Sequence, residues 1–436
     1  MASPRLMLDI YEEHLGEVAF LSSRWERALV APDRDLSDAA EWEERLLAHV
    51  DGLVVGGTEL AEMLLVPALK SEEPMEVFAA ALALLESGAS GWEPILATLQ
   101  EGSPEGNPGI QRALELTAGL EPRRLLPLMS SQPSLQRLVL EVLAFHGTLP
   151  EGLVMEFVSH ADSKLRAAAW RGLQRFPGAF KQDSLRAALE STEPEVLHAA
   201  ISAGLIGNAR AAWSACRKVA ERHAPGYREA LVLLALGGGE RELGLLLELL
   251  RIPSLVVDVL WALGFCGRAS AAEACLPLMA EDRTVAALAG EAFSAITGLR
   301  FEGKYLAAPE TPRAEEPIPL EQEALDADLV PRPEDALQVP NPEPVAAWWQ
   351  AHRTRFEQGA RYLRGTPFEG SSLLAALRHE PMRRRGVLAL ELAIRSRGRH
   401  FVQTRAFTHR QSAEMDEAHA SRSSLVLRQF DSMLSG

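Results

Sequence analysis

Residues 194–207, PEVLHAAISAGLIG, contain in one stretch the pattern that decides the fold. A proline stands at the start, where its missing N–H would have no helical partner in any case. Val196, Ala199, Ala200 and Ala203 then recur at helical spacing. The closing glycine can adopt the left-handed conformation that ends a helix. The stretch therefore predicts a short apolar helix with a defined start and end.

The same pattern occurs eight times between residues 74 and 298. Each copy begins at a proline or an aspartate and follows another short helix with an apolar face of its own. Where aspartate replaces proline, its carboxylate can accept hydrogen bonds from the free N–H groups of the first turn. The regular recurrence predicts a tandem repeat of helical hairpins. The eight starts are Pro74, Pro108, Pro133, Asp162, Pro194, Pro225, Pro253 and Asp282.

A single hairpin of this kind cannot bury both of its apolar faces, whereas stacked hairpins bury them against their neighbours. We therefore predict an all-α fold, an α-solenoid with an N-terminal helical cap, a Pro-rich strap and a C-terminal helical segment. The predicted segments are 1–70 for the cap, 71–300 for about eight repeats, 301–344 for the strap and 345–436 for the C-terminal segment.

Residues 302–344 differ in composition from the repeats. Nine of the 27 prolines fall here among acidic residues, so an extended strap is expected rather than helix or sheet. Two apolar pairs, Ile318 with Leu320 and Leu325 with Leu329, are candidates for attaching the strap to the solenoid surface.

A helix is expected to resume at Pro344, because Trp349, Phe356 and Leu363 recur at helical spacing. Residues 371–398 then contain one further helix–turn–helix pattern. Two arrangements of this late unit remain open: it continues the stack, or it folds back on it.

The net charge of −16 is unevenly distributed along the chain. Residues 1–300 contain 26 basic and 41 acidic side chains, whereas residues 351–436 contain 15 basic and 8 acidic ones. An acidic body opposes nucleic-acid binding, which needs a positive field over the contact surface. The basic C-terminal segment could face an acidic partner or the acidic body of the same chain. We expect no nucleic-acid partner.

Composition also limits the cellular setting. No apolar run reaches the roughly 18 residues of a transmembrane helix, and acidic residues near the N-terminus are unlike a signal peptide. Cys216, Cys266 and Cys275 are too few and too irregular for a disulfide framework or a zinc site. These features predict a reduced, cytoplasmic protein with no membrane span.

The motifs of common catalytic sites are missing from the sequence. It contains no HExxH metal motif, no phosphate-binding loop and no GxSxG nucleophile elbow, and the eleven histidines do not cluster. We therefore predict no catalytic, cofactor-binding or metal-ligating residues and no cofactor. A non-enzymatic binding scaffold is the function class that remains, because solenoids offer an extended recognition surface.

The repeats between Pro74 and Gly298 resemble HEAT-type repeats, including short bacterial versions of about thirty residues. The whole chain also resembles a poorly characterised bacterial family of HEAT-like proteins. The stretches that carry this resemblance are EEHLGEVAFLSSRW, ERLLAHVDGL, AITGL at 295–299, WWQAHRTRFEQGARYLRGTP and RRRGVLALELA. The resemblance places this chain with proteins whose genes are found near type VI secretion loci. The resemblance implies a cytoplasmic helper that binds cargo or spike components, and it implies no catalytic residues.

The predicted function is therefore a protein-binding scaffold, adaptor or chaperone. Type VI secretion effector, adaptor or spike proteins are the partners that the resemblance implies. Two alternatives remain open: a HEAT-like enzyme similar to alkylated-base DNA glycosylases or bilin lyases, and a structural subunit of a larger assembly. The acidic body opposes the glycosylase, and no residue indicates a lyase.

Trp348 is the first candidate partner-binding residue. On one helix it points about 100° away from Trp349, which lies on the apolar stripe and is expected in the core. Trp348 either packs against the strap or the solenoid, or is an exposed anchor for a partner, since Trp is enriched in binding hot spots.

Arg383, Arg384 and Arg385 are the second candidate set. They begin a helix after Pro381, where cations are mildly unfavourable, so an acidic partner or the acidic strap could hold them there. The other interpretation is a solvated ridge. A wider anion-binding face would also include Arg395, Arg397, Arg399 and His400.

Overall fold

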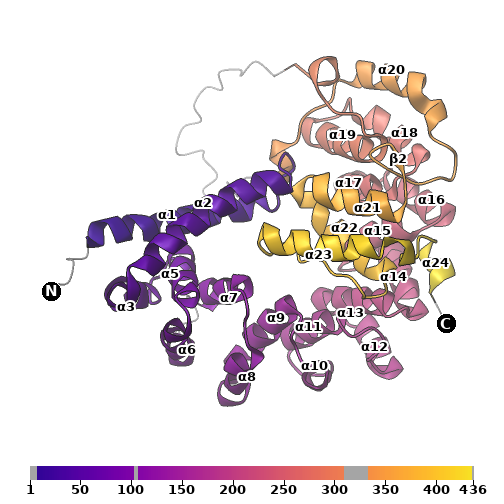
Figure 1. Cartoon of the computed structure of the whole chain (residues 1–436). Helices are drawn as coiled ribbons and strands as arrows, with labels where there is room; N and C mark the ends of the chain where they lie inside the picture. Colours follow the sequence, from indigo (N-terminus) through magenta and orange to yellow (C-terminus); the bar gives the residue numbers. More distant parts are fainter. Residues whose placement is uncertain (1–6, 103–106, 309–331, 435–436) are drawn as a thin grey trace, which may run out of the picture. The chain divides into compact units, whose positions relative to one another are not determined.

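The computed structural model describes residues 7–102, 107–308 and 332–434. The predicted all-α repeat fold is confirmed, because within these residues nearly all regular structure is helical and neighbouring helices pack in sequence order. The chain divides into two compact units, residues 1–226 with 374–436 and residues 227–373 (Figure 1). These boundaries differ from the four segments predicted from the sequence.

Two long helices begin the first unit and pack against each other. The Asp35 carboxylate caps the second of them by accepting hydrogen bonds from the backbone N–H groups of Ser37 and Asp38. Asp38 in turn accepts from the Asp35 N–H, which completes a capping box. The helices that precede the repeats are α1 (Leu8–Ala28), α2 (Leu36–Val55), α3 (Gly57–Leu60), the π-helical turn Ala61–Leu65 and α4 (Val66–Ala68).

The predicted repeat starts lie at or within three residues of α-helix starts. The helix α5 begins at Pro74 and α13 at Pro194. Asp162 and Asp282 cap α11 and α19 through their side chains, as the sequence indicated. The repeats of the first unit contain α5 (Pro74–Glu86), α6 (Trp92–Glu101), α7 (Asn107–Leu116), α8 (Pro122–Ser131), α9 (Gln136–His146), α10 (Glu151–Phe157), α11 (Ser163–Leu173), α12 (Gln182–Leu189), α13 (Pro194–Ile206) and α14 (Arg210–Arg222).

The second helices of successive repeats pack against one another in a row, α5 on α7, α7 on α9, α9 on α11 and α11 on α13. Small residues allow the close approach of neighbouring helices. A methyl group added at Gly204 of α13 would lie 2.5 Å from the Ala212 Cβ of α14, far inside a normal contact distance. Packing of α13 against α14 therefore depends on a position that has no room for a side chain.

The second unit contains helices of the same repeat pattern. It contains α15 (Tyr227–Gly237), α16 (Glu240–Leu249), α17 (Val256–Cys266), α18 (Ala269–Leu278), α19 (Arg283–Thr297) and α20 (Pro342–His352). Most of the predicted strap, including Ile318, Leu320, Leu325 and Leu329, lies outside the described residues. The described ends of the strap meet, since the Ala307 N–H donates to the Val339 carbonyl at 2.9 Å.

The predicted helix from Pro344 to Gly365 is wrong beyond His352. A short hairpin follows instead, β1 (Tyr362–Leu363) paired with β2 (Thr366–Pro367). Its backbone bonds to the ends of repeat helices, with the Tyr362 N–H donating to the Gly267 carbonyl at 2.7 Å. A Cβ at Gly267 would lie 2.4 Å from the Tyr362 carbonyl oxygen, so this approach requires glycine. These long-range bonds outweigh the helical spacing of Phe356 and Leu363.

The late helices fold back on the repeats of the first unit, which settles the question that the sequence left open. Residues 374–436 contain the end of α21 (Gly370–His379), then α22 (Met382–Arg395), α23 (Thr408–Ala420) and α24 (Phe430–Met433). They contact α2, α13 and α14. Figure 1 shows them in yellow on the side of α9, α11 and α13, opposite α8, α10 and α12.

We predict that Gly204→Ala lowers the melting temperature, because the added methyl group forces α13 away from α14. The expected loss is about 1–3 kcal/mol of unfolding free energy, the range for overpacked cores. Gly16→Ala is the matched control, since that helical glycine is exposed and nothing lies within 4 Å of an added Cβ. The control should gain about 0.5–1 kcal/mol from helix propensity. Thermal unfolding followed by circular dichroism measures both, and equal shifts of the two variants would contradict the packing argument.

Candidate binding pocket

The C-terminal segment, residues 374–434, is attached to other helices of the first unit at several points. The Phe407 ring packs on Trp25 of α1 with ring centroids 5.2 Å apart. Arg410 of α23 donates to the Phe145 carbonyl at the end of α9, at 2.8 Å. Phe430 of α24 packs edge-on against Trp213 of α14, at 5.5 Å between centroids. The segment therefore covers a surface that an isolated solenoid would leave open.

A buried carboxylate forms the tightest of these attachments. Glu43 of α2 is 4% exposed and accepts hydrogen bonds from the Thr408 backbone N–H and the Thr408 hydroxyl, at 2.7–3.0 Å. Burial raises the pKa of Glu43, although these hydrogen bonds oppose the shift. Its bonds satisfy the first free N–H of α23, so the carboxylate also acts as the cap of that helix.

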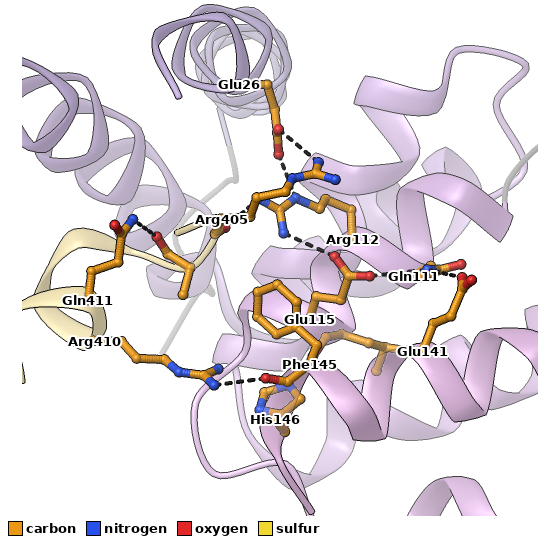
Figure 2. A network of polar contacts seen from close by, with 12 residues as sticks. Glu26, Gln111, Arg112, Glu115, Glu141, Phe145, His146, Arg405, Arg410 and Gln411 are labelled. Carbon is orange, nitrogen blue, oxygen red and sulfur yellow. Dashed lines mark hydrogen bonds and ion pairs between the residues drawn. The ribbon is translucent and has the colours of Figure 1, made fainter. Parts of the chain in front are cut away.

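Arg112 of α7 organises a polar network between the repeats and the C-terminal segment (Figure 2). Its guanidinium donates to Glu26 of α1, to Glu115 at 3.0 Å and to the Arg405 carbonyl at 2.7 Å. Arg405 returns an ion pair to Glu26 at 3.1 Å. Because Arg112 is 7% exposed and three acceptors surround it, the network fixes the position of residues near 405.

A pocket of about 590 Å³ remains between these partners. One wall comes from α7, α9 and the end of α11, and the other from residues 386–405 of the C-terminal segment. This volume lies within the range of small-ligand and side-chain binding sites. Its lining includes Gln111, Glu115, Arg137, Glu141, Phe145, Arg171, Gln174, Arg175, Leu390, Phe401, Val402, Gln403 and Arg405.

The pocket lining carries more positive than negative charge, four arginines against two glutamates, in a chain whose net charge is −16. The Glu141 carboxylate accepts from Gln111 at 3.0 Å, from Arg137 at 3.1 Å and from Arg171 at 2.8 Å. Arg137 and Arg171 keep 50% and 41% of their side chains exposed, so their ion pairs are screened by solvent. The rim of the pocket is therefore positively charged and wet.

Arg175 differs from the other arginines of the pocket. Its guanidinium lies over the Phe401 ring, 4.3 Å from the centroid, and the side chain is half-buried. Within the described residues the Arg175 guanidinium makes no hydrogen bond or ion pair. Burial lowers the pKa of Arg175, and nearby Arg410 lowers it further while Glu414 opposes the shift.

The structure places the predicted site residue Trp348 in the second unit, and Trp348 is not part of the pocket lining. It is half-buried, packs edge-on against Phe293 of α19 at 6.1 Å and stacks on His352 at 4.5 Å. The Trp348 side chain therefore packs against other residues of the second unit. Trp349 is 1% exposed, which confirms its predicted place in the core.

The predicted partner-binding role of Arg384 and Arg385 is wrong, because these side chains are only 2% and 0% exposed. Arg384 forms an ion pair with buried Glu380 at 3.0 Å. Arg385 donates to the carbonyl of Leu377, whose usual helical donor would be the N–H that Pro381 lacks. Both arginines therefore serve the interior of the fold.

Hydrogen bonds of the first turn of α22 explain why arginines are tolerated at this helix start. The Met382 N–H donates to the Arg34 carbonyl at 2.8 Å, and the Arg383 N–H donates to the Ala31 carbonyl at 3.2 Å. Carbonyls of the α1–α2 connection thus satisfy the N–H groups that attract anions at most helix starts. Arg383 itself is half-buried.

The residues of the predicted wider anion-binding face differ in exposure, since two are buried and two are exposed. Arg395 is 2% exposed, pairs with Glu391 at 2.7 Å and donates to the Val426 carbonyl at 3.0 Å. His400 is 6% exposed, and burial lowers its pKa. Arg397 and Arg399 are exposed. These residues therefore do not form one surface.

Sequence reasoning missed the residues of the pocket. Arg171 and Arg175 lie in the repeat stretch SKLRAAAWRGLQRF, where one more arginine draws no notice. The available signal was the placement of Arg175 just beyond an apolar helix, where a cation favours the negative helix end. Its juxtaposition with Phe401, more than two hundred residues later, had no local signal.

Neither a family model nor a curated protein sequence matches this chain.

The parts of the chain that the structure describes contain no cluster of three or more His, Cys, Asp or Glu side chains that could hold a metal ion. No helix among them is long and apolar enough to cross a membrane.

We predict that Arg385→Met destabilises the first unit by about 2–4 kcal/mol, because it leaves two buried acceptors, the Leu377 carbonyl and the Gln411 side chain, without their donor. Exposed Arg399→Met is the control and should stay within about 0.5 kcal/mol of the wild type. Urea unfolding monitored by tryptophan fluorescence measures both. A midpoint for Arg385→Met equal to that of the control would contradict a structural role.

We predict that stability falls on acidification in part because of His146. This imidazole donates to the Leu114 carbonyl at 2.8 Å, and burial lowers its pKa. The unfolded chain therefore binds the proton first, so unfolding free energy decreases as pH drops below about 6.5. His146→Gln keeps a donor and should flatten this pH dependence, whereas exposed His419→Gln should not. Melting temperatures between pH 5 and 8 test the difference; parallel curves for both variants would contradict it.

Proposed function

We propose that this protein is a non-catalytic helical-repeat scaffold that binds a partner protein, and that the pocket between α7, α9, α11 and residues 386–405 receives an acidic segment of that partner. The observation that carries the proposal is the excess of arginine over glutamate around a pocket in a strongly acidic chain. A local positive field of this kind favours acidic partners and increases their rate of association.

The way the C-terminal segment lies supports a defined site rather than a long open surface. The segment is attached to α2, α7 and α9 through the bonds of Glu43, Arg112 and Arg410 that are given above. The opening that remains is framed by two rigid elements, repeat helices on one side and α22 on the other. Rigid walls reduce the conformational entropy that binding must overcome.

The resemblance to HEAT-like proteins near type VI secretion genes makes effector, adaptor and spike proteins the first partners to test. We propose that the encounter takes place in the cytoplasm. An acidic stretch on one of these proteins is the feature that would select it, because the rim cations Arg137 and Arg171 are exposed.

A photo-crosslinking amino acid at Gln174 tests the proposed site directly, since this residue lines the pocket. The same amino acid at exposed Ala187 on α12, which is not part of the pocket lining, is the control. With purified candidate partners, we expect a crosslink from position 174 to an acidic stretch and none from position 187. Equal crosslinking from both positions, or none to any candidate, would argue against the site.

Charge reversal provides a quantitative test. The double variant Arg137→Glu with Arg171→Glu should weaken partner binding about tenfold or more, because it replaces the cations of the rim by carboxylates. The control Arg123→Glu with Lys164→Glu makes the same change in net charge at exposed positions outside the pocket. Isothermal titration calorimetry measures both. Equal losses would mean that net charge, and not the pocket, attracts the partner.

A further inference from the structure

We infer that Arg175 is the residue that binds the carboxylate of the acidic segment, with Phe401 holding its guanidinium in place. This inference rests on the proposed function, because it assigns the anion-binding group within the same pocket. It names one residue and one ligand class, a glutamate or aspartate side chain on an extended peptide.

The environment of Arg175 fixes the position of its guanidinium. Phe401 lies under it at 4.3 Å from Cζ to the ring centroid, a distance at which cation–π attraction is effective. On the repeat side, Gly147 ends α9 in the left-handed conformation, and a Cβ there would lie 3.4 Å from the Arg175 Cζ. A glycine at this position therefore leaves room for the guanidinium beside the helix end.

The N–H donors of Arg175 are not used within the described residues. Other arginines around the pocket are engaged: Arg137 and Arg171 with Glu141, and Arg410 with Glu414 at 3.0 Å. A half-buried guanidinium without an acceptor is costly, because it has lost part of its hydration without a replacement. A ligand carboxylate could accept two of its N–H groups side by side.

The nearby carboxylates are committed to other donors. Glu414 accepts from the Arg410 side chain and from the Gln403 backbone N–H at 2.6 Å. Glu141 accepts from Gln111 and from two arginines, as described above. Neither makes a hydrogen bond to Arg175, which leaves the guanidinium for a ligand.

The remaining lining favours a peptide over a polyphosphate or a nucleic acid. Gln174 and Gln403 offer amide groups that can donate to and accept from a peptide backbone. Leu390 and Val402 supply apolar contact for the aliphatic part of a glutamate side chain. A carboxylate side chain on a peptide backbone matches this combination.

The test uses the full chain and two labelled hexapeptides, hexaglutamate and hexaglutamine, followed by fluorescence anisotropy at about 50 mM salt, where exposed charges are weakly screened. We expect the wild type to bind hexaglutamate at least tenfold more tightly than hexaglutamine. Arg175→Gln should remove most of this preference, and Arg175→Lys should keep part of it, because lysine retains the charge but loses the two-pronged donor geometry.

Thermal unfolding accompanies each variant and separates binding from folding. The melting temperature of Arg175→Gln should stay close to that of the wild type, because the loss of the cation–π contact with Phe401 is offset by the removal of a half-buried cation that has no acceptor in the described fold. A lower melting temperature would instead indicate a structural role and would overturn the inference. Phe401→Leu, which removes the ring under the guanidinium, should weaken hexaglutamate binding less than Arg175→Gln does.

Three results would overturn the inference: equal binding of the two peptides, unchanged hexaglutamate binding by Arg175→Gln, or displacement of bound hexaglutamate by an equal concentration of inorganic phosphate. The last result would mean that the pocket takes small anions. The proposed function is judged separately. A crosslink from position 174 that persists in Arg175→Gln supports the scaffold and refutes this role of Arg175. Arg175-dependent peptide binding without any partner crosslink supports the role of Arg175 and argues against the scaffold.

Discussion

The hydrogen bonds between the buried Glu43 carboxylate and Thr408 join two parts of the chain that are 365 residues apart. Ionised carboxylates rarely enter an interior without several donors, and here the first turn of α23 and a hydroxyl supply them. The Arg112 network then extends this attachment along α7, and Arg410 extends it to the end of α9. The C-terminal segment is thus held to the repeats by polar groups as much as by apolar packing. The pocket exists because both of its walls are positioned by these contacts.

The repeat helices could be predicted because their signals are local. Proline or aspartate at a helix start and apolar residues at helical spacing act within a dozen residues, so starts such as Pro74 and Asp282 agree with the structure. The segment after His352 failed for the opposite reason. There the backbone of residues 362–365 finds partners at the ends of α17 and α19, and such distant partners leave no periodic trace in the sequence.

The candidate site shows the same division between local and distant causes. A run of three arginines suggested a surface, yet Arg385 is buried because Pro381 leaves the Leu377 carbonyl without its usual donor. The arginines that do line a pocket come from separate elements, Arg137 from α9, Arg171 from α11 and Arg405 from the C-terminal segment. Only the folded chain brings them together. The run of three arginines in the sequence therefore indicated a surface that Arg384 and Arg385 do not reach.

The origin of the pocket walls has a consequence for biosynthesis. The repeat wall, from Gln111 to Arg175, leaves the ribosome well before residues 386–405 are translated. Repeat helices interact mainly with their neighbours and can stack as they emerge. The nascent protein therefore passes through a stage in which its repeats are formed but the cavity has only one side. The second wall forms only after residues 386–405 have been synthesised and have docked, so the pocket is absent from shorter translation products.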